Sequence, residues 1–239
     1  MKLSQRLQHI EQMIPTRYQH IWDCCCDHGF LGAALLERQA APYIHFVDIV
    51  PTLIADLTQR LEQFFPNSPS QWTTQCQDVT TLALSQYQGK QLVIIAGVGG
   101  DLMTDMVHAL HQQFSHLDID FLLCPVYQQF LLRDALIKMN MSLIEEKLVE
   151  DKGRFYEVMF VSQQAPVDSS NTISPAGHHI WQASDATQLA IANRYLNKTL
   201  THYQRMQLNA PKQAKKALKH YQKLLTNNVM SEIETSKPT

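Results

Sequence analysis

Three aspartates stand where their carboxylates could bind a ligand, because each closes a segment with the composition of a β-strand. They are Asp23, Asp48 and Asp78. A carboxylate there can accept hydrogen bonds from both hydroxyls of a ribose or from an adenine amino group, and it can pair with an ammonium. A single aspartate in such a place is more often a turn or cap residue. Three in succession favour a site for a nucleotide-like cofactor.

The first of these aspartates opens the segment 21–32, which reads Ile-Trp-Asp-Cys-Cys-Cys-Asp-His-Gly-Phe-Leu-Gly. An apolar run, a turn and a helical run predict strand, loop and helix, and in open α/β sheets cofactors bind at the loop after the first strand. No Gly-x-Gly-x-x-Gly pattern follows this strand, so the sequence lacks the glycine-rich turn that binds a pyrophosphate. The pattern therefore suits S-adenosylmethionine (SAM) better than a dinucleotide.

Hydrophobic periodicity predicts the elements that must position these residues. Helices are expected at residues 3–14, 31–38, 51–64, 102–114 and 130–139. Strands are expected at residues 20–25, 43–48, 72–76, 91–96 and 119–124. Residues 142–150 and 155–162 predict a closing hairpin. Five βα repeats and a hairpin describe a doubly wound α/β fold, a mostly parallel sheet with an antiparallel edge.

The rest of the chain has a different character. Residues 163–177 are rich in Ser, Pro, Asn and Gly, which is typical of a linker. Beyond them, Leu189 and Ala192 begin an apolar helical face, and a second face follows Pro211. We expect two helices joined near residues 209–211, forming an antiparallel hairpin. The predicted domains are therefore 1–162 and 163–239.

Charge is distributed unevenly although the net charge is only −2. Residues 186–231 carry +8 with no acidic residue, so the remainder carries −10. The basic residues of this segment are Arg194, Lys198, Arg205, Lys212, Lys215, Lys216, Lys219 and Lys223. Their spacing also fits an ordinary solvated helix face, but the missing acids favour contact with a polyanion such as RNA.

Composition narrows the class of protein further. The chain has 239 residues, 45% of them apolar, and no run long enough to span a membrane. We expect a soluble, cytoplasmic protein. The five cysteines include three consecutive ones and no Cys-x-x-Cys pair, so reduced thiols are favoured over a metal site. The sequence leaves the oligomeric state open, a monomer included.

Three segments together resemble a known family. They are Asp-Cys-Cys-Cys-Asp-His-Gly-Phe-Leu from residue 23, Phe-Val-Asp-Ile-Val from residue 46, and Ile-Ala-Gly-Val-Gly-Gly from residue 95. This set is similar to the TrmK family of bacterial tRNA adenine N1-methyltransferases. The resemblance extends over residues 3–162, and the C-terminal part is similar to the family's helical coiled-coil appendage in pattern only.

The resemblance implies a Rossmann-like class I methyltransferase fold with a C-terminal coiled-coil hairpin, SAM as donor, and N1 of adenine 22 of tRNA as acceptor. The implied cofactor-binding residues are Asp23, Cys25, Asp27, His28, Asp48, Ile49, Gln77, Asp78, Ala96, Gly97, Val98 and Gly99. Among these, Asp48 would hold the ribose, and Gln77 and Asp78 the adenine. Residues 96–99 would form the floor beside the transferred methyl group.

Three positions differ from the family's pattern. Cys25 replaces a glycine, and a left-handed backbone angle there would cost a cysteine about 1 kcal/mol. Asp48 is shorter than the family's usual glutamate. Cys124 and Val126 replace two amide residues that flank Pro125 and could hydrogen-bond a base.

Methyl transfer from a sulfonium needs mainly alignment in a dry pocket. The methylated adenine is cationic, so a carboxylate could stabilise the developing charge. Asp27 is the catalytic candidate, with His28 as a polar orienter; a core or capping role for His28 is the alternative. Tyr127 or Phe30 could stack on an extruded base, although either could be plain core. The expected RNA-binding residues are Tyr127, Arg205, Lys212, Lys215, Lys216, Lys219 and Lys223.

Two other classes of function stay in view. A non-catalytic tRNA-binding protein could retain a degenerate methyltransferase fold. An NAD-type oxidoreductase is a third class, which the missing glycine pattern argues against.

Overall fold

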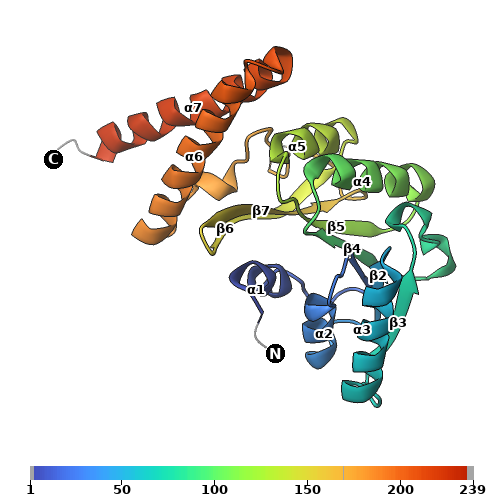
Figure 1. The fold of residues 1–239 in the computed structure, drawn as a ribbon. Helices are drawn as coiled ribbons and strands as arrows, with labels where there is room; N and C mark the ends of the chain where they lie inside the picture. Colours follow the sequence, from blue (N-terminus) through green and yellow to red (C-terminus); the bar gives the residue numbers. More distant parts are fainter. Residues whose placement is uncertain (1–2, 169, 236–239) are drawn as a thin grey trace. The chain divides into compact units, whose positions relative to one another are not determined.

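The computed structural model describes residues 3–168 and 170–235 (Figure 1). Two compact units make up the chain, Met1–Ile173 and Ser174–Thr239, and each is described by itself. In the described residues, no helix has the length and apolar character needed to cross a membrane.

The first unit is built on one seven-stranded sheet with the order β3-β2-β1-β4-β5-β7-β6. Strands β1 to β5 run parallel, and β7 pairs antiparallel with both β5 and β6. The strands are β1 His20–Cys24, β2 Tyr43–Asp48, β3 Gln71–Cys76, β4 Gln91–Ala96, β5 Ile119–Cys124, β6 Ser142–Asp151 and β7 Arg154–Ser162. The order reverses between β1 and β4, which places a topological switch point at their carboxyl ends.

Helices cover both faces of this sheet (Figure 1). They are α1 Gln5–Gln12, α2 Phe30–Glu37, α3 Pro51–Phe64, α4 Gly100–Phe114 and α5 Gln129–Lys138. One core joins α1, α2 and α3 to the sheet through residues such as Ile21 and Phe46. The other joins α4 and α5 to the opposite face, where Trp22 and Val93 are fully buried. Successive β1 side chains therefore alternate between the two cores.

The predicted order of strands and helices is confirmed, with two corrections. One of the five predicted repeats lacks an α-helix: residues 79–90 between β3 and β4 form only the 3-10 turns Val79–Thr81 and Leu84–Gln86. This segment is at the lower limit for a helical crossover between parallel strands. The sequence also predicts Phe64 on the apolar face of the helix 51–64, but its side chain is 66% exposed, while Ile54 packs into the core.

The second unit is a helical hairpin, α6 Ala186–Met206 and α7 Pro211–Thr235, preceded by the 3-10 turn His179–Trp181. Its core is aromatic. Trp181 stacks on Tyr195 at 5.6 Å between ring centroids, and Tyr203 stacks on Tyr221 at 5.7 Å. Leu189, predicted on the buried face, is 43% exposed.

The segment after β7 is only partly a linker. The backbone N–H of Leu143 donates to the carbonyl of Asn171 at 2.6 Å, and Ser142 forms an isolated bridge with Thr172. Ile173 is buried in the core of the first unit. The compact unit therefore continues past residue 162, where we placed the domain boundary. Residues 236–239, at the end of the predicted second domain, lie outside the described residues.

Candidate active site

The loop between β1 and α2 has an unusual backbone. Cys25, Asp27 and Gly29 all have positive φ, at 55°, 50° and 68°. The loop is held by the N–H of Cys26, which donates to the carbonyl of Val47 at 3.2 Å, and by the N–H of Gly29, which donates to the carbonyl of Cys26 at 2.7 Å. The expected left-handed conformation at Cys25 is confirmed. A side chain in this region costs about 1 to 2 kcal/mol.

Asp23, at the end of β1, is buried under α2. Its Oδ2 accepts a hydrogen bond from the backbone N–H of Gly32 at 2.9 Å. A Cβ on Gly32 would lie 2.2 Å from the Phe46 ring and 2.9 Å from this oxygen, so only glycine permits the approach. Burial raises the pKa of Asp23 to about 7; the Gly32 N–H opposes this shift and the charge of Asp48 adds to it. Asp23 can therefore change its protonation state near neutral pH.

Asp48, at the end of β2, fastens the same loop. Its Oδ2 accepts from the N–H of Asp27 and its Oδ1 from the N–H of Val50, both at 3.0 Å. A carboxylate has about four lone-pair sites, so both oxygens can still accept from a ligand. Asp27 itself projects outward, with its Oδ1 3.6 Å from Nε2 of His28. Their side chains are 68% and 54% exposed, so both are open to a second substrate.

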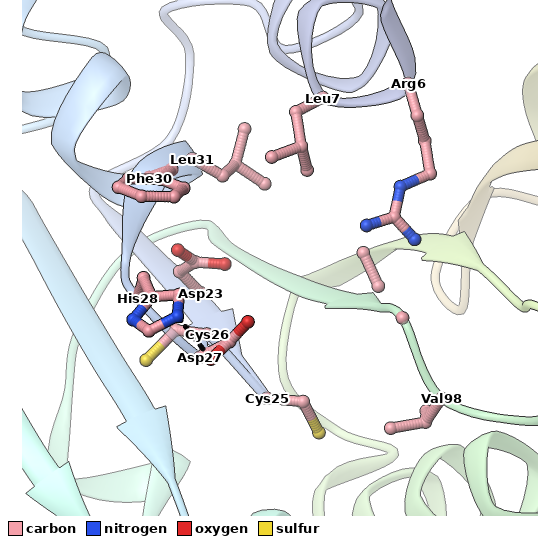
Figure 2. A pocket seen from close by; sticks show the side chains of 12 residues that line it. Arg6, Leu7, Asp23, Cys25, Cys26, Asp27, His28, Phe30, Leu31 and Val98 are labelled. Atoms are coloured by element: carbon pink, nitrogen blue, oxygen red, sulfur yellow. Dashed lines mark ion pairs between the residues drawn. The ribbon is translucent and has the colours of Figure 1, made fainter. Parts of the chain in front are cut away.

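A cavity of about 340 Å³ lies beside this loop (Figure 2). It is lined by Arg6, Leu7, Asp23, Cys25, Cys26, Asp27, His28, Phe30, Leu31, Ala96, Gly97 and Val98. The lining comes from α1, from the loop and start of α2, and from the turn after β4. The cavity thus occupies the switch point of the sheet, where α/β folds bind their ligands.

The turn after β4 forms one wall of the cavity with almost no side chain in the way. Gly97 has φ 101°, which favours glycine, and Val98 accepts a backbone hydrogen bond from Val126 at 2.9 Å. At Gly99, a Cβ would lie 2.4 Å from the ring of Tyr127. The exposed Tyr127 therefore rests on the turn that borders the cavity, and the absence of a side chain at Gly99 lets it do so.

The structure brings together only part of the predicted cofactor set. Seven of the twelve residues line the cavity, namely Asp23, Cys25, Asp27, His28, Ala96, Gly97 and Val98. The other five, Asp48, Ile49, Gln77, Asp78 and Gly99, lie outside its lining.

Two of the outer residues have local partners of their own. Asp78 caps the turn Val79–Thr81, and its Oδ1 accepts from the backbone N–H and the hydroxyl of Thr80, both at 2.8 Å. The amide of Gln77 donates to Gln75 at 2.8 Å. The capping role that the sequence left open for a strand-end aspartate is thus realised at Asp78. A role for Gln77 and Asp78 toward a ligand stays a prediction.

Four lining residues were not predicted. Cys26 and Leu31 belong to the loop and helix that the sequence did single out, whereas Arg6 and Leu7 lie elsewhere. Both belong to α1, which precedes the first strand and carries no cofactor motif. The sequence predicts Leu7 on the apolar face of this helix, where it packs against the core, yet an arginine beside such a face is ordinarily solvated. Only the packing of α1 against α2 and β6 brings both side chains to the cavity.

The thiols near the cavity are poor nucleophiles. Burial, followed by the negative charges of Asp48 and Asp23, raises the pKa of Cys25 to about 12. Burial likewise raises the pKa of Cys24 and Cys26. Within the part of the chain that the structure describes, no group of three or more His, Cys, Asp or Glu side chains could hold a metal ion.

The predicted RNA-binding cations of the second unit are all exposed. Arg205 lies in α6, and Lys212, Lys215, Lys216, Lys219 and Lys223 lie in α7. Arg205 also lines a surface hollow of about 410 Å³ with Lys198 and His202. Two cations beside one hollow are suited to an anionic group such as a phosphate.

The sheet order and the cavity at its switch point define a Rossmann-like methyltransferase fold. A family model described as a methyltransferase domain matches residues 3–159, and the chain belongs to this family. A comparison with curated proteins gives no match.

Solved structures share the fold at low sequence identity. An uncharacterized protein from Listeria monocytogenes serotype 4b has a TM-score of 0.73 and 16% identity, covering 94% of this chain and all of that one. TrmK of M. capricolum, in complex with S-adenosyl-homocysteine, has a TM-score of 0.70 and 16% identity over 95% and 99% of the two chains. The tRNA methyltransferase TrmK of B. subtilis has a TM-score of 0.66 and 22% identity over 94% and 96%. The predicted fold is thereby confirmed.

Proposed function

We propose that this protein transfers a methyl group from SAM to N1 of an adenine in tRNA, at position 22 by resemblance. The observation that carries the proposal is the cavity at the switch point, bordered by Asp23 and Asp27 on one side and by the glycine turn after β4 on the other. Membership of a methyltransferase family supports the reaction class. Likeness to two TrmK structures supports the choice of tRNA.

The residues of the site fit SAM. Asp23, Asp27 and His28 would surround its methionine part, whose ammonium favours carboxylate partners. Asp48, which keeps acceptor capacity on both oxygens, would take the ribose hydroxyls. Gln77 and Asp78, just after β3, would hydrogen-bond the adenine, while residues 96–99 would lie beside the methyl group.

The protein's part in the reaction is chiefly to position the reactants. SAM supplies a methyl group that its sulfonium already activates, so N1 of the adenine needs no general base to attack it. The turn after β4 presents a smooth wall against which N1 and the methyl carbon can align. Asp27, exposed at the rim of the cavity, is placed to stabilise the positive charge that the adenine ring gains.

The target base must leave its helix before its pairing edge can react. Tyr127 offers an exposed ring directly over Gly99, and Phe30 lines the cavity with 38% of its surface exposed. Stacking on either ring would hold an extruded base by its face and leave N1 free. The basic side chains of α6 and α7 would bind the tRNA backbone.

The direct test is transfer of a labelled methyl group from SAM to unmodified tRNA. Wild-type protein should label tRNA, and Asp27→Asn should lower the rate at saturating SAM about 100-fold, in addition to weakening SAM binding. Asp56→Asn, which changes an exposed aspartate of α3 outside the cavity, is the matched control. No incorporation by wild-type protein, with SAM bound, would refute the proposed reaction.

A non-catalytic tRNA-binding protein is the second candidate, and Cys25 favours it. The left-handed residue carries a Cβ and a sulfur that line the cavity in which the cofactor would lie. Calorimetry with SAM separates the two candidates. Binding with a dissociation constant in the micromolar range supports the enzyme; no heat at millimolar SAM, with tRNA still bound, supports the second candidate.

A further inference from the structure

Arg6 places a cation in the wall of the cavity opposite the acidic loop (Figure 2). Its guanidinium lies over the ring of Tyr156, with Cζ 5.0 Å from the ring centroid. It also borders the glycine turn, because a Cβ built on Gly97 would be 3.8 Å from its Nη1. Within residues 3–168 and 170–235, no carboxylate forms an ion pair with this guanidinium.

The helix that carries Arg6 is firmly anchored. Ser4 caps α1 by accepting from the N–H of Leu7, Ile10 is completely buried, and the backbone N–H of Arg6 donates to Asp151 at 3.3 Å. The stacked ring of Tyr156 then limits where the guanidinium can go. Arg6 is therefore held in place before any ligand arrives, which lowers the entropic cost of binding through it.

The cavity thus has two walls of opposite charge. Asp23 and Asp27 lie on the side of β1 and its loop, and Arg6 lies on the side of α1. Neither aspartate forms an ion pair with Arg6. A ligand that satisfies both walls must itself carry a cation and an anion a short distance apart. An α-amino acid group has this character, with an ammonium for the aspartates and a planar carboxylate for the guanidinium fork.

We propose that Arg6 binds the α-carboxylate of the methionine part of SAM, and that it makes the protein selective for methyl donors that retain this carboxylate. The inference rests on the proposed function, since it assumes SAM in this cavity. Arg6 is a binding residue that fixes one end of the donor, and through it the direction in which the methyl group points. Recognition by a charged pair is worth about tenfold or more in affinity.

The test compares SAM with decarboxylated SAM, which keeps the adenosine, the sulfonium and the ammonium and lacks only the carboxylate. Calorimetry on the full chain should show that wild-type protein binds SAM about tenfold or more tightly than the decarboxylated compound. In Arg6→Gln this preference should vanish, because SAM binding weakens and binding of the decarboxylated compound stays within about twofold.

Two further variants complete the experiment. Arg154→Gln removes an exposed cation of β7 outside the cavity and should keep the wild-type preference. Arg6→Lys retains the charge without the fork and should recover part of the preference. Thermal melts of all variants check that they remain folded.

The outcomes distinguish failure of the Arg6 assignment from failure of the proposed function. Equal loss of affinity for both compounds in Arg6→Gln, or no loss for either, would overturn the assignment of Arg6. Weaker tRNA binding by Arg6→Gln with an unchanged SAM preference would assign the guanidinium to the nucleic acid and also overturn it. Failure of wild-type protein to bind either compound would remove SAM itself, and with it the proposed function.

Discussion

At the scale of single residues, the site depends on carboxylates in very different surroundings. Asp23 is buried beneath α2 with one backbone donor, Asp48 accepts one loop N–H on each oxygen and keeps acceptor capacity, and Asp27 is open to solvent. The sequence predicted these positions, because strand ends at one edge of a parallel sheet must converge. It could not predict their burial, which depends on how closely Gly32 lets α2 approach.

Asp23 should make stability depend on pH. Its folded pKa is raised to about 7, so its neutral form stabilises the fold at low pH. This contribution is lost as pH rises from the unfolded value toward 7, at up to about 1.4 kcal/mol per pH unit. Asp23→Asn abolishes the titration. Urea unfolding should therefore show the variant gaining stability relative to wild type between pH 5 and 7; a constant difference would contradict the raised pKa.

Replacing Cys25 with glycine should increase both the stability of the protein and its affinity for SAM. Cys25→Gly removes a Cβ from a left-handed position and should stabilise the protein by about 1 kcal/mol in urea unfolding. It should also raise SAM affinity in calorimetry, because it clears space in the cavity. Cys25→Ala removes the sulfur but keeps the Cβ, so it separates the two effects. A destabilised glycine variant would show that the thiol packs productively.

At the scale of elements, the site lies where α1, the loop after β1 and the turn after β4 meet, and Tyr127 from the loop after β5 rests on that turn. Apolar periodicity predicted these strands and their order well, since a buried parallel strand is a short continuous apolar run. The description as five βα repeats was wrong between β3 and β4, and no pattern predicted that α1 adds Arg6 to the cavity. Long-range packing decides both features, and no local pattern encodes it.

Adding one methyl group at Gly99 should disturb the contact between Tyr127 and the turn after β4. Gly99→Ala places a Cβ 2.4 Å from the ring and must displace Tyr127 or the turn. We expect a loss of about 1 to 3 kcal/mol in stability and a slower methyl transfer. In the double variant with Tyr127→Ala the clash is gone, so the two stability losses should be less than additive. Strict additivity would mean that the ring does not press on this turn.

At the scale of the whole molecule, the chain pairs an acidic catalytic unit with a basic helical hairpin. The charge asymmetry and the hairpin were both evident from the sequence, because they depend on composition and helical period. The place of Trp181 in the aromatic core of the hairpin was not evident, since Trp181 lies outside the two periodic segments. Contact between this protein and tRNA is a proposal, and the exposure of all seven expected RNA-binding side chains supports it.

Reversing the charge of α7 should weaken tRNA binding. The triple change of Lys215, Lys216 and Lys219 to Glu should lower affinity most at low salt, and the slope of log affinity against log salt should fall by about 2 to 3. Lys152→Glu, in the turn between β6 and β7, serves as a control with little effect. Fluorescence anisotropy with labelled tRNA over a salt series measures both quantities. Unchanged affinity at low salt would remove the hairpin from the tRNA site.

The central claim is that this fold, with this cavity, methylates adenine in tRNA. Mass spectrometry of nucleosides from tRNA incubated with the protein and isotope-labelled SAM tests it most directly. We predict labelled 1-methyladenosine as the product, absent when SAM is omitted. A label in another nucleoside would contradict the acceptor, and a complete absence of labelled nucleosides would contradict the enzymatic function.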